Sequence, residues 1–236
     1  MNKILKLLSI LSIFSPLLQA EDALRSSTTG FYPIWENTGN IEGHRLARVG
    51  ISDAEVGIGN FAQIGINPVL FAYRTPNAYL KFNLGRTEVS RWSLQLGFYY
   101  VLEQASRSSM SPMYVSRLDN PDFTLLLAPT SLNHSLNLSG WMQIHQSLTA
   151  LPEISSGKLD NRIFAGYSAV AEFLPEERHG ILLHFSEVGF WDHDFNLLGA
   201  SYRYRNTWME FRLGYFYRVH KTGAQSSPLF NLTFLL

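Results

Sequence analysis

The sequence predicts an all-β protein, a transmembrane antiparallel β-barrel of about twelve strands, within a range of roughly 10 to 14. Apolar and polar residues alternate with a period of two along most of the chain, and no segment carries a capped helical stripe. The composition is rich in aromatic residues (14%) and poor in charged ones (16%). The absence of cysteine excludes a disulfide scaffold and a thiolate metal site. A zero net charge without a basic run disfavours a nucleic-acid partner.

Residues 1–20 have the layout of a secretory signal peptide. Lys3 and Lys6 precede an apolar core at 7–14, Pro16 follows it, and we expect cleavage after Ala20. The apolar core is too short to cross ~30 Å of hydrocarbon, which disfavours the alternative of a membrane anchor. An exported, aromatic chain without disulfides is typical of the bacterial outer membrane, where we expect this protein.

The next segment, residues 21–43, is polar and irregular, and we interpret it as a mostly unpaired periplasmic lead-in to a barrel at 44–236. The first half of that barrel alternates in short runs bounded by turn residues such as Gly59-Asn60 and Asn67-Pro68. These runs predict strands at 44–51, 53–58, 61–66, 78–85, 91–103 and 123–137, the last interrupted at Pro129.

The second half has longer alternating runs, separated by turn residues at 138–140, 175–180 and 192–194. The expected strands are 141–151, 161–174, 181–191, 195–205, 207–220 and 229–236. We expect external loops at 67–77, 104–122, 152–160 and 221–228, and mostly short periplasmic turns between them.

The alternation also assigns the two faces of each strand. In 207–220, Met209, Phe211 and Leu213 share one face while Glu210 and Arg212 share the other. A soluble β-sandwich would alternate too, but strands of ~10–13 residues suit a tilted crossing of ~25 Å. Tryptophan and tyrosine gather toward strand ends, as in the aromatic girdles of membrane barrels.

The final strand carries Phe230, Leu232, Phe234 and Leu236 on one face. This pattern resembles the C-terminal assembly signal of Gram-negative outer-membrane proteins, whose usual last residue is Phe rather than Leu. The segment 53–84 resembles the early hairpins of small, poorly characterised porin-like outer-membrane barrels. The resemblance implies an outer-membrane location and contacts with outer-membrane lipids, periplasmic chaperones and the barrel-assembly machinery. It implies no activity.

The face opposite the apolar one predicts a polar lumen with an excess of basic residues. The candidate lumen-lining residues are Arg48, Glu55, Lys81, Gln95, Gln143, His145, Arg162, Glu172, Arg203, Arg205, Glu210, Arg212 and Arg218. Such a lumen suits a monomeric passive pore for polar or anionic solutes. The alternative is structural filling, in which arginine and glutamate side chains satisfy one another.

Two further functions remain open at this stage. A lipid-modifying enzyme would need a serine, a base that activates it and a third group that orients the base. The adjacent His134 and Ser135 point to opposite faces of their strand. His184 and Ser186 share a face, but the sequence identifies no third member for this pair. A surface-recognition barrel would use the loop at 104–122. The turn at 191–194 is more typical of a solvated turn than of a metal site. We therefore expect no catalytic residue, metal or cofactor.

Overall fold

The structure is a computed structural model that describes residues 38–39, 47–72, 75–101, 125–155, 162–176, 178–188, 195–220 and 223–236. The expected signal peptide at 1–20, most of the lead-in at 21–43 and the loop at 104–122 therefore lie outside the described residues.

The described part of the chain consists of antiparallel strands and one short helix. Their bounds are β1 (Ala47–Gly50), β2 (Ala54–Ile58), β3 (Ala62–Ile66), α2 (Pro68–Ala72), β4 (Asn77–Arg86), β5 (Ser90–Val101), β6 (Leu125–Leu127), β7 (Thr130–Ser139), β8 (Met142–Ser155), β9 (Arg162–Glu176), β10 (His179–Val188), β11 (Phe195–Arg205), β12 (Met209–His220) and β13 (Gly223–Leu235).

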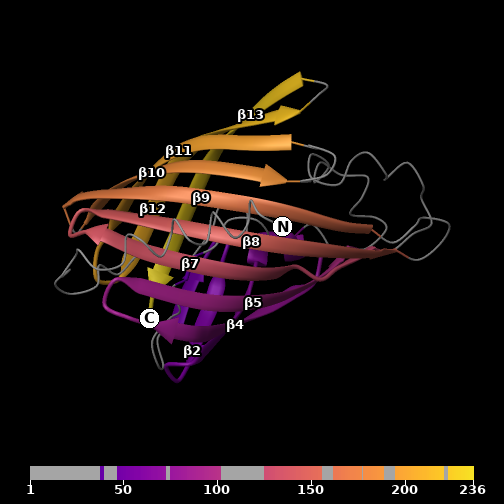
Figure 1. Cartoon of the computed structure of the whole chain (residues 1–236), viewed down its shortest axis with the longest axis horizontal. Helices are drawn as coiled ribbons and strands as arrows, with labels where there is room; N and C mark the ends of the chain where they lie inside the picture. Colours follow the sequence, from indigo (N-terminus) through magenta and orange to yellow (C-terminus); the bar gives the residue numbers. More distant parts are fainter. Residues whose placement is uncertain are drawn as a thin grey trace, which may run out of the picture.

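These strands close into a twelve-stranded antiparallel barrel, which confirms the predicted fold class. Strands that are neighbours in sequence pair with each other, and β13 pairs with β1 to close the ring. β6 and β7 count as one strand because both pair with β5 and β8. The interruption lies at Ala128 and Pro129, as predicted, because proline has no N–H to donate to the ladder. Figure 1 shows β7 to β10 crossing the front of the barrel and β2 and β12 passing behind them.

Two strands are longer than the sequence predicts. β8 continues through Pro152 to Ser155, and β13 begins at Gly223 within the expected loop at 221–228. The start of β13 is polar and lacks alternation, but it continues the ladder with β12, where Tyr217 is opposite Ser226. Tyr215 Oη also donates a hydrogen bond to Ser226 Oγ at 2.7 Å. Pairing with an established neighbour thus overrides weak local propensity.

The helix α2 was not expected within the connection at 67–77. Pro68 occupies its first position, where the missing N–H costs nothing. Asn67 caps it, because Asn67 Oδ1 accepts a hydrogen bond from Leu70 N at 3.3 Å. Asn77 then fixes the connection by accepting from Asn67 N at 2.6 Å and donating to the Thr75 carbonyl at 3.0 Å. No helix in the described ranges is long and apolar enough to cross a membrane.

The two ends of the barrel differ in their connections. The turns at 59–61, 87–89, 140–141 and 206–208 lie at one end, which we call the short-turn end, together with the end of β13. The connection at 67–76, which contains α2, lies at the opposite end. The wall is also uneven in height, because β1 to β3 have four or five residues whereas β9 has 15 and β13 has 13.

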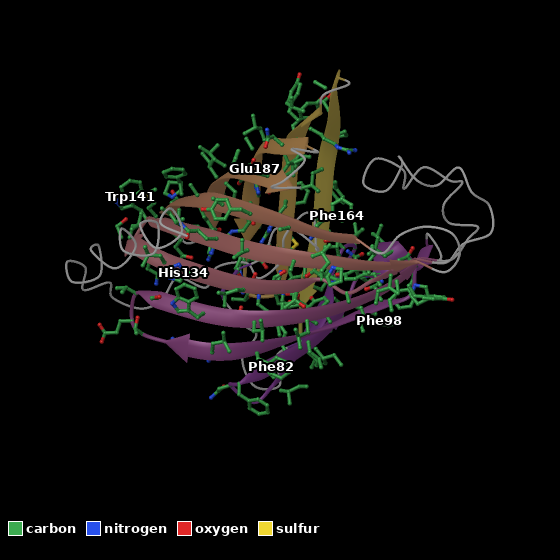
Figure 2. The ribbon with its side chains drawn as sticks, turned by 45° about the vertical axis from the view of Figure 1, so that its right-hand side comes forward. Phe82, Phe98, His134, Trp141, Phe164 and Glu187 are labelled. Atoms are coloured by element: carbon green, nitrogen blue, oxygen red, sulfur yellow. The ribbon has the colours of Figure 1, made fainter. Side chains whose placement is uncertain are left out.

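The two faces of the wall have opposite chemistry. On β5, Leu96 and Phe98 point outward and are 42% and 50% exposed, while Gln95 and Tyr99 point inward and are 4% and 1% exposed. The same alternation holds around the ring, so most polar side chains of the wall point into the enclosed space and most apolar ones cover the outside. In Figure 2, His134 and Trp141 lie toward the end that holds the turn at 140–141, while Phe98 lies toward the other.

Candidate functional site

The enclosed space of the barrel, its lumen, is where most of the candidate residues lie. Ten of them are buried, namely Arg48, Glu55, Lys81, Gln95, Gln143, His145, Glu172, Arg203, Glu210 and Arg212. Arg205 and Arg218 are partly buried, and the side chain of Arg162 lies outside the described ones. The alternation along each strand brings these residues to one face, and closure of the ring turns that face inward.

A belt of ion pairs crosses the lumen between β12 and the β1–β2 hairpin. Glu210 Oε1 lies 2.7 Å from Arg212 Nε and 3.6 Å from Arg48 Nη2. Arg48 Nη2 is also 3.7 Å from Asp53 Oδ2. Asp53 Oδ1 in turn accepts a hydrogen bond from Asn231 Nδ2 at 3.2 Å. The belt therefore links β1, the turn that follows it, β12 and β13 through charges that balance each other.

A second polar chain runs across β7, β8, β9 and β11. Ser135 Oγ lies 2.7 Å from His145 Nδ1, and His145 Nε2 lies 3.0 Å from Glu172 Oε2. The other carboxylate oxygen, Oε1, forms an ion pair with Arg203 Nη1 at 2.6 Å. Ser135 and His145 meet because the tight turn at 140–141 places them opposite each other in register, and Glu172 lies diagonally across from His145 on β9. We call this chain the Ser135–His145–Glu172 relay.

The order of the relay is that of a serine hydrolase, but its surroundings are those of a closed interior. Ser135, His145 and Glu172 are each 2% exposed or less. Ser135 Oγ also accepts a hydrogen bond from the backbone N–H of Gly39 at 2.7 Å. A nucleophile needs a base in hydrogen-bond reach and access to substrate. The relay supplies the base, and the backbone of Gly39 covers the hydroxyl.

Lys81 lies in a third group, on the wall formed by β2 to β5. It faces Gln63 on β3 and Gln95 on β5 in register, and all three are buried. Nearby, Tyr79 Oη donates a hydrogen bond to Glu55 Oε1. The phenol of Tyr79 thus takes the place of water as a hydrogen-bond donor to the buried carboxylate of Glu55.

An apolar layer fills the other half of the lumen, away from the short-turn end. Its inward-facing members, all 3% exposed or less, are Tyr99, Leu127, Leu151, Leu197 and Phe216. Leu197 and Phe216 form a buried cluster with the partly buried Leu229 of β13. The predicted set of lumen-lining residues, all polar or charged, did not include this layer, although alternation places Phe216 on the same face as Glu210 and Arg212.

The histidines outside the relay have different partners. His134 lies on the opposite face from Ser135, where it stacks on Trp92 with a ring separation of 4.1 Å, and its Nε2 lies 2.9 Å from Ser90 Oγ. Its Nδ1 has no hydrogen-bond partner among the described residues, so no acid orients this imidazole. His184 Nε2 lies 2.9 Å from Ser201 Oγ inside the barrel.

The structure gives no metal centre within the ranges it describes, where no group of three His, Asp or Glu side chains is arranged to hold an ion. The turn at 191–194, weighed above as a metal site, lies outside those ranges. Comparison with known proteins finds no matching family model and no matching curated protein.

Proposed function

We propose that this chain is an integral β-barrel of the bacterial outer membrane whose lumen is a narrow channel for small polar solutes, with a preference for anions. The apolar outer face carries the first part of the proposal. Leu148, Leu183 and Leu213, on three different strands, are each about half exposed, and most of their neighbours on that face are apolar too. A continuous apolar surface of this kind is unusual on a water-soluble monomer and suits contact with acyl chains.

Aromatic pairs at the short-turn end support the same proposal. Trp141 stacks on Phe173 at 6.2 Å, and Trp208 stacks on Phe234 at 6.1 Å. Rings of this type anchor barrels at the boundary between hydrocarbon and headgroups. Phe230, Phe234 and Leu236 are exposed on the outer face beside β12, where the barrel-assembly machinery could bind them before closure. We expect insertion as a monomer.

Quenching of tryptophan fluorescence by brominated lipids tests the insertion. In vesicles, Trp141 and Trp208 should be quenched most strongly by bromine atoms near the headgroups and weakly by bromine at the bilayer centre. Replacing both by Phe should reduce that quenching, and the other three tryptophans supply the signal that remains. A chain that stays folded and monomeric in buffer without detergent, with no quenching at any depth, would show that the outer face does not contact lipid.

The polar inner face supports the channel. Four acidic and four basic side chains are fully buried in the described lumen, Asp53, Glu55, Glu172 and Glu210 against Arg48, Lys81, Arg203 and Arg212. The additional positive charge comes from arginines that are only partly buried, Arg91, Arg205 and Arg218. Rings of basic side chains favour the passage of anions. In this conformation the lumen is closed, because its charged side chains and the apolar layer are buried against one another.

Conductance in planar bilayers tests the channel. We expect rare, small openings from the natural chain, with a reversal potential in a salt gradient that indicates anion preference. Phe216→Ala should enlarge the openings because it removes a large aromatic ring from the apolar layer, whereas Phe98→Ala on the outer face should leave them unchanged. If all three proteins fold correctly and none of them conducts, the side chains in the lumen only stabilise the barrel and form no channel.

The Ser135–His145–Glu172 relay favours a second candidate, ester hydrolysis in the lumen. Ser135 Oγ would attack an ester carbonyl, its proton would pass to His145 Nδ1 and then to the leaving alcohol, and water would release the acid. A fluorophosphonate probe should then label Ser135. Labelling should vanish in Ser135→Ala and persist in Ser147→Ala, an inward serine bonded to Asn133 rather than to histidine. A folded barrel that takes up no probe would remove this candidate.

A further inference from the structure

We infer that Ser93 and Ser135 form a binding site for one backbone peptide group inside the barrel, and that its occupant is the chain's own Thr38–Gly39 segment, held there as an internal plug. The inference about the site stands on its own contacts. Its consequence for solute passage rests on the proposed channel, because the plug occupies the lumen through which a solute would move.

Both polar atoms of a single peptide group are held. Ser93 Oγ donates a hydrogen bond to the carbonyl oxygen of Thr38 at 3.2 Å, and Gly39 N donates to Ser135 Oγ at 2.7 Å. The carbonyl of Thr38 and the N–H of Gly39 belong to the same peptide bond, and they point in opposite directions from it. The two serines come from adjacent strands, β5 and β7, so the peptide group bridges them on the inner wall.

The side chains behind the two serines hold them in place. Asn133 Nδ2 donates to Ser93 Oγ at 3.4 Å, and the relay through His145 engages Ser135 Oγ at 2.7 Å. A hydroxyl has one proton and two lone pairs, so Ser135 can bond to His145 and still accept from Gly39. The site is therefore pre-organised by the wall, which lowers the entropy cost of holding the segment.

Glycine is required at position 39 by its distance from the wall. A Cβ built on Gly39 would overlap the carbonyl oxygen of Arg91 and lie 2.7 Å from the amide nitrogen of Ser135. Both obstacles are backbone atoms of paired strands, which cannot move aside as a flexible side chain would. Any side chain at this position must displace the segment from the wall.

Burial shows that the segment lies inside the barrel. Thr38 is 7% exposed, and the two serines that hold it are 0% and 2% exposed. Both hydrogen bonds are buried, in the half of the lumen that also contains the relay. A water-filled lumen would offer the same peptide group equivalent partners, so the contacts gain strength from the dry surroundings.

The absence of cysteine in the natural sequence makes a thiol-labelling experiment direct. Thr38→Cys should react with a maleimide far more slowly in the folded barrel than Thr207→Cys, which replaces an exposed residue in the turn at 206–208. Adding Ser93→Ala should speed the reaction at position 38 about tenfold, since one buried hydrogen bond is lost. Adding Gly39→Ala should raise it to the rate of the exposed control. Ser201→Ala, which replaces an inward serine of β11 that hydrogen-bonds His184, should leave it unchanged.

The same variants in planar bilayers separate the plug from the channel. If Gly39→Ala both speeds the labelling of Cys at position 38 and increases the frequency of channel openings, the binding site and the channel are both supported. If labelling at position 38 becomes faster but no variant conducts, the binding site is supported and the channel is contradicted. Equal reactivity at positions 38 and 207 in the otherwise natural barrel, or unchanged protection in Gly39→Ala, overturns the binding site whatever the conductance. Heat-dependent gel migration of each variant confirms that the barrel is folded.

Discussion

Replacing Leu148 by arginine measures which solvent covers the outside of the barrel. Leu148 lies at the middle of β8, points outward and is 53% exposed. Ile154, near the end of the same strand, points outward and is 48% exposed, which makes it a matched control. In water the two substitutions should cost nearly the same, because two equally exposed positions lose similar contacts.

In a bilayer the two costs differ because they depend on depth. An arginine at the hydrocarbon midplane of a barrel costs about 2–4 kcal/mol, whereas one near the interface costs about 0–1 kcal/mol. We therefore expect Leu148→Arg to lower the free energy of unfolding by about 2 kcal/mol or more relative to Ile154→Arg. The assay is reversible unfolding in denaturant from lipid vesicles, followed by tryptophan fluorescence. Equal losses for the two variants would refute the assignment of the outer face to lipid.

Three further predictions concern the interior. Glu210→Gln should lower the free energy of unfolding by about 3–5 kcal/mol, because its buried arginine partners lose their counter-charge. The control Glu176→Gln replaces a side chain that is 75% exposed. In the same denaturant titration it should change the free energy of unfolding by less than about 0.5 kcal/mol. Gly65→Ala should cost about 1–3 kcal/mol, since its Cβ would overlap the ring of Tyr79. The loss should persist in the background of Tyr79→Phe, because the overlapping atoms include the ring carbons Cζ and Cε1, which phenylalanine keeps. Phe216→Ala should cost about 3–5 kcal/mol by opening a cavity in the apolar layer, measured by thermal unfolding in detergent. An unchanged midpoint for any of these would contradict the packing described at that residue.

The strands with the strongest alternation are the ones that sequence reasoning placed best. β11 has the predicted bounds, and β9 and β12 differ from the prediction by one or two residues at an end. Their outward and inward faces are chemically distinct, so a shift of one residue would reverse both faces. β13 was misjudged at its start because Ser226 and its neighbours are polar on both faces, and only pairing with β12 makes them a strand.

The site was harder to predict than the fold, for a physical reason. Alternation shows that Ser135 and His145 point inward, but their contact depends on the register set by the turn at 140–141. The placement of Gly39 against β5 and β7 depends on packing between segments far apart in sequence, which leaves no local periodic signal. The composition of 21–43 shows that the segment is polar and contains glycine, but it does not predict which strands Gly39 contacts.

The uneven height of the wall has a consequence for the surrounding bilayer. A strand of five residues extends roughly 17 Å, less than the ~25 Å apolar band of an outer-membrane barrel. The side of the ring made of β1 to β3 is therefore too low to match the hydrocarbon, while β9 and β13 are tall enough. In the bilayer location that we propose, lipids beside the low side would shorten or tilt their acyl chains to avoid exposing them, and the ring would thin the membrane locally along one flank.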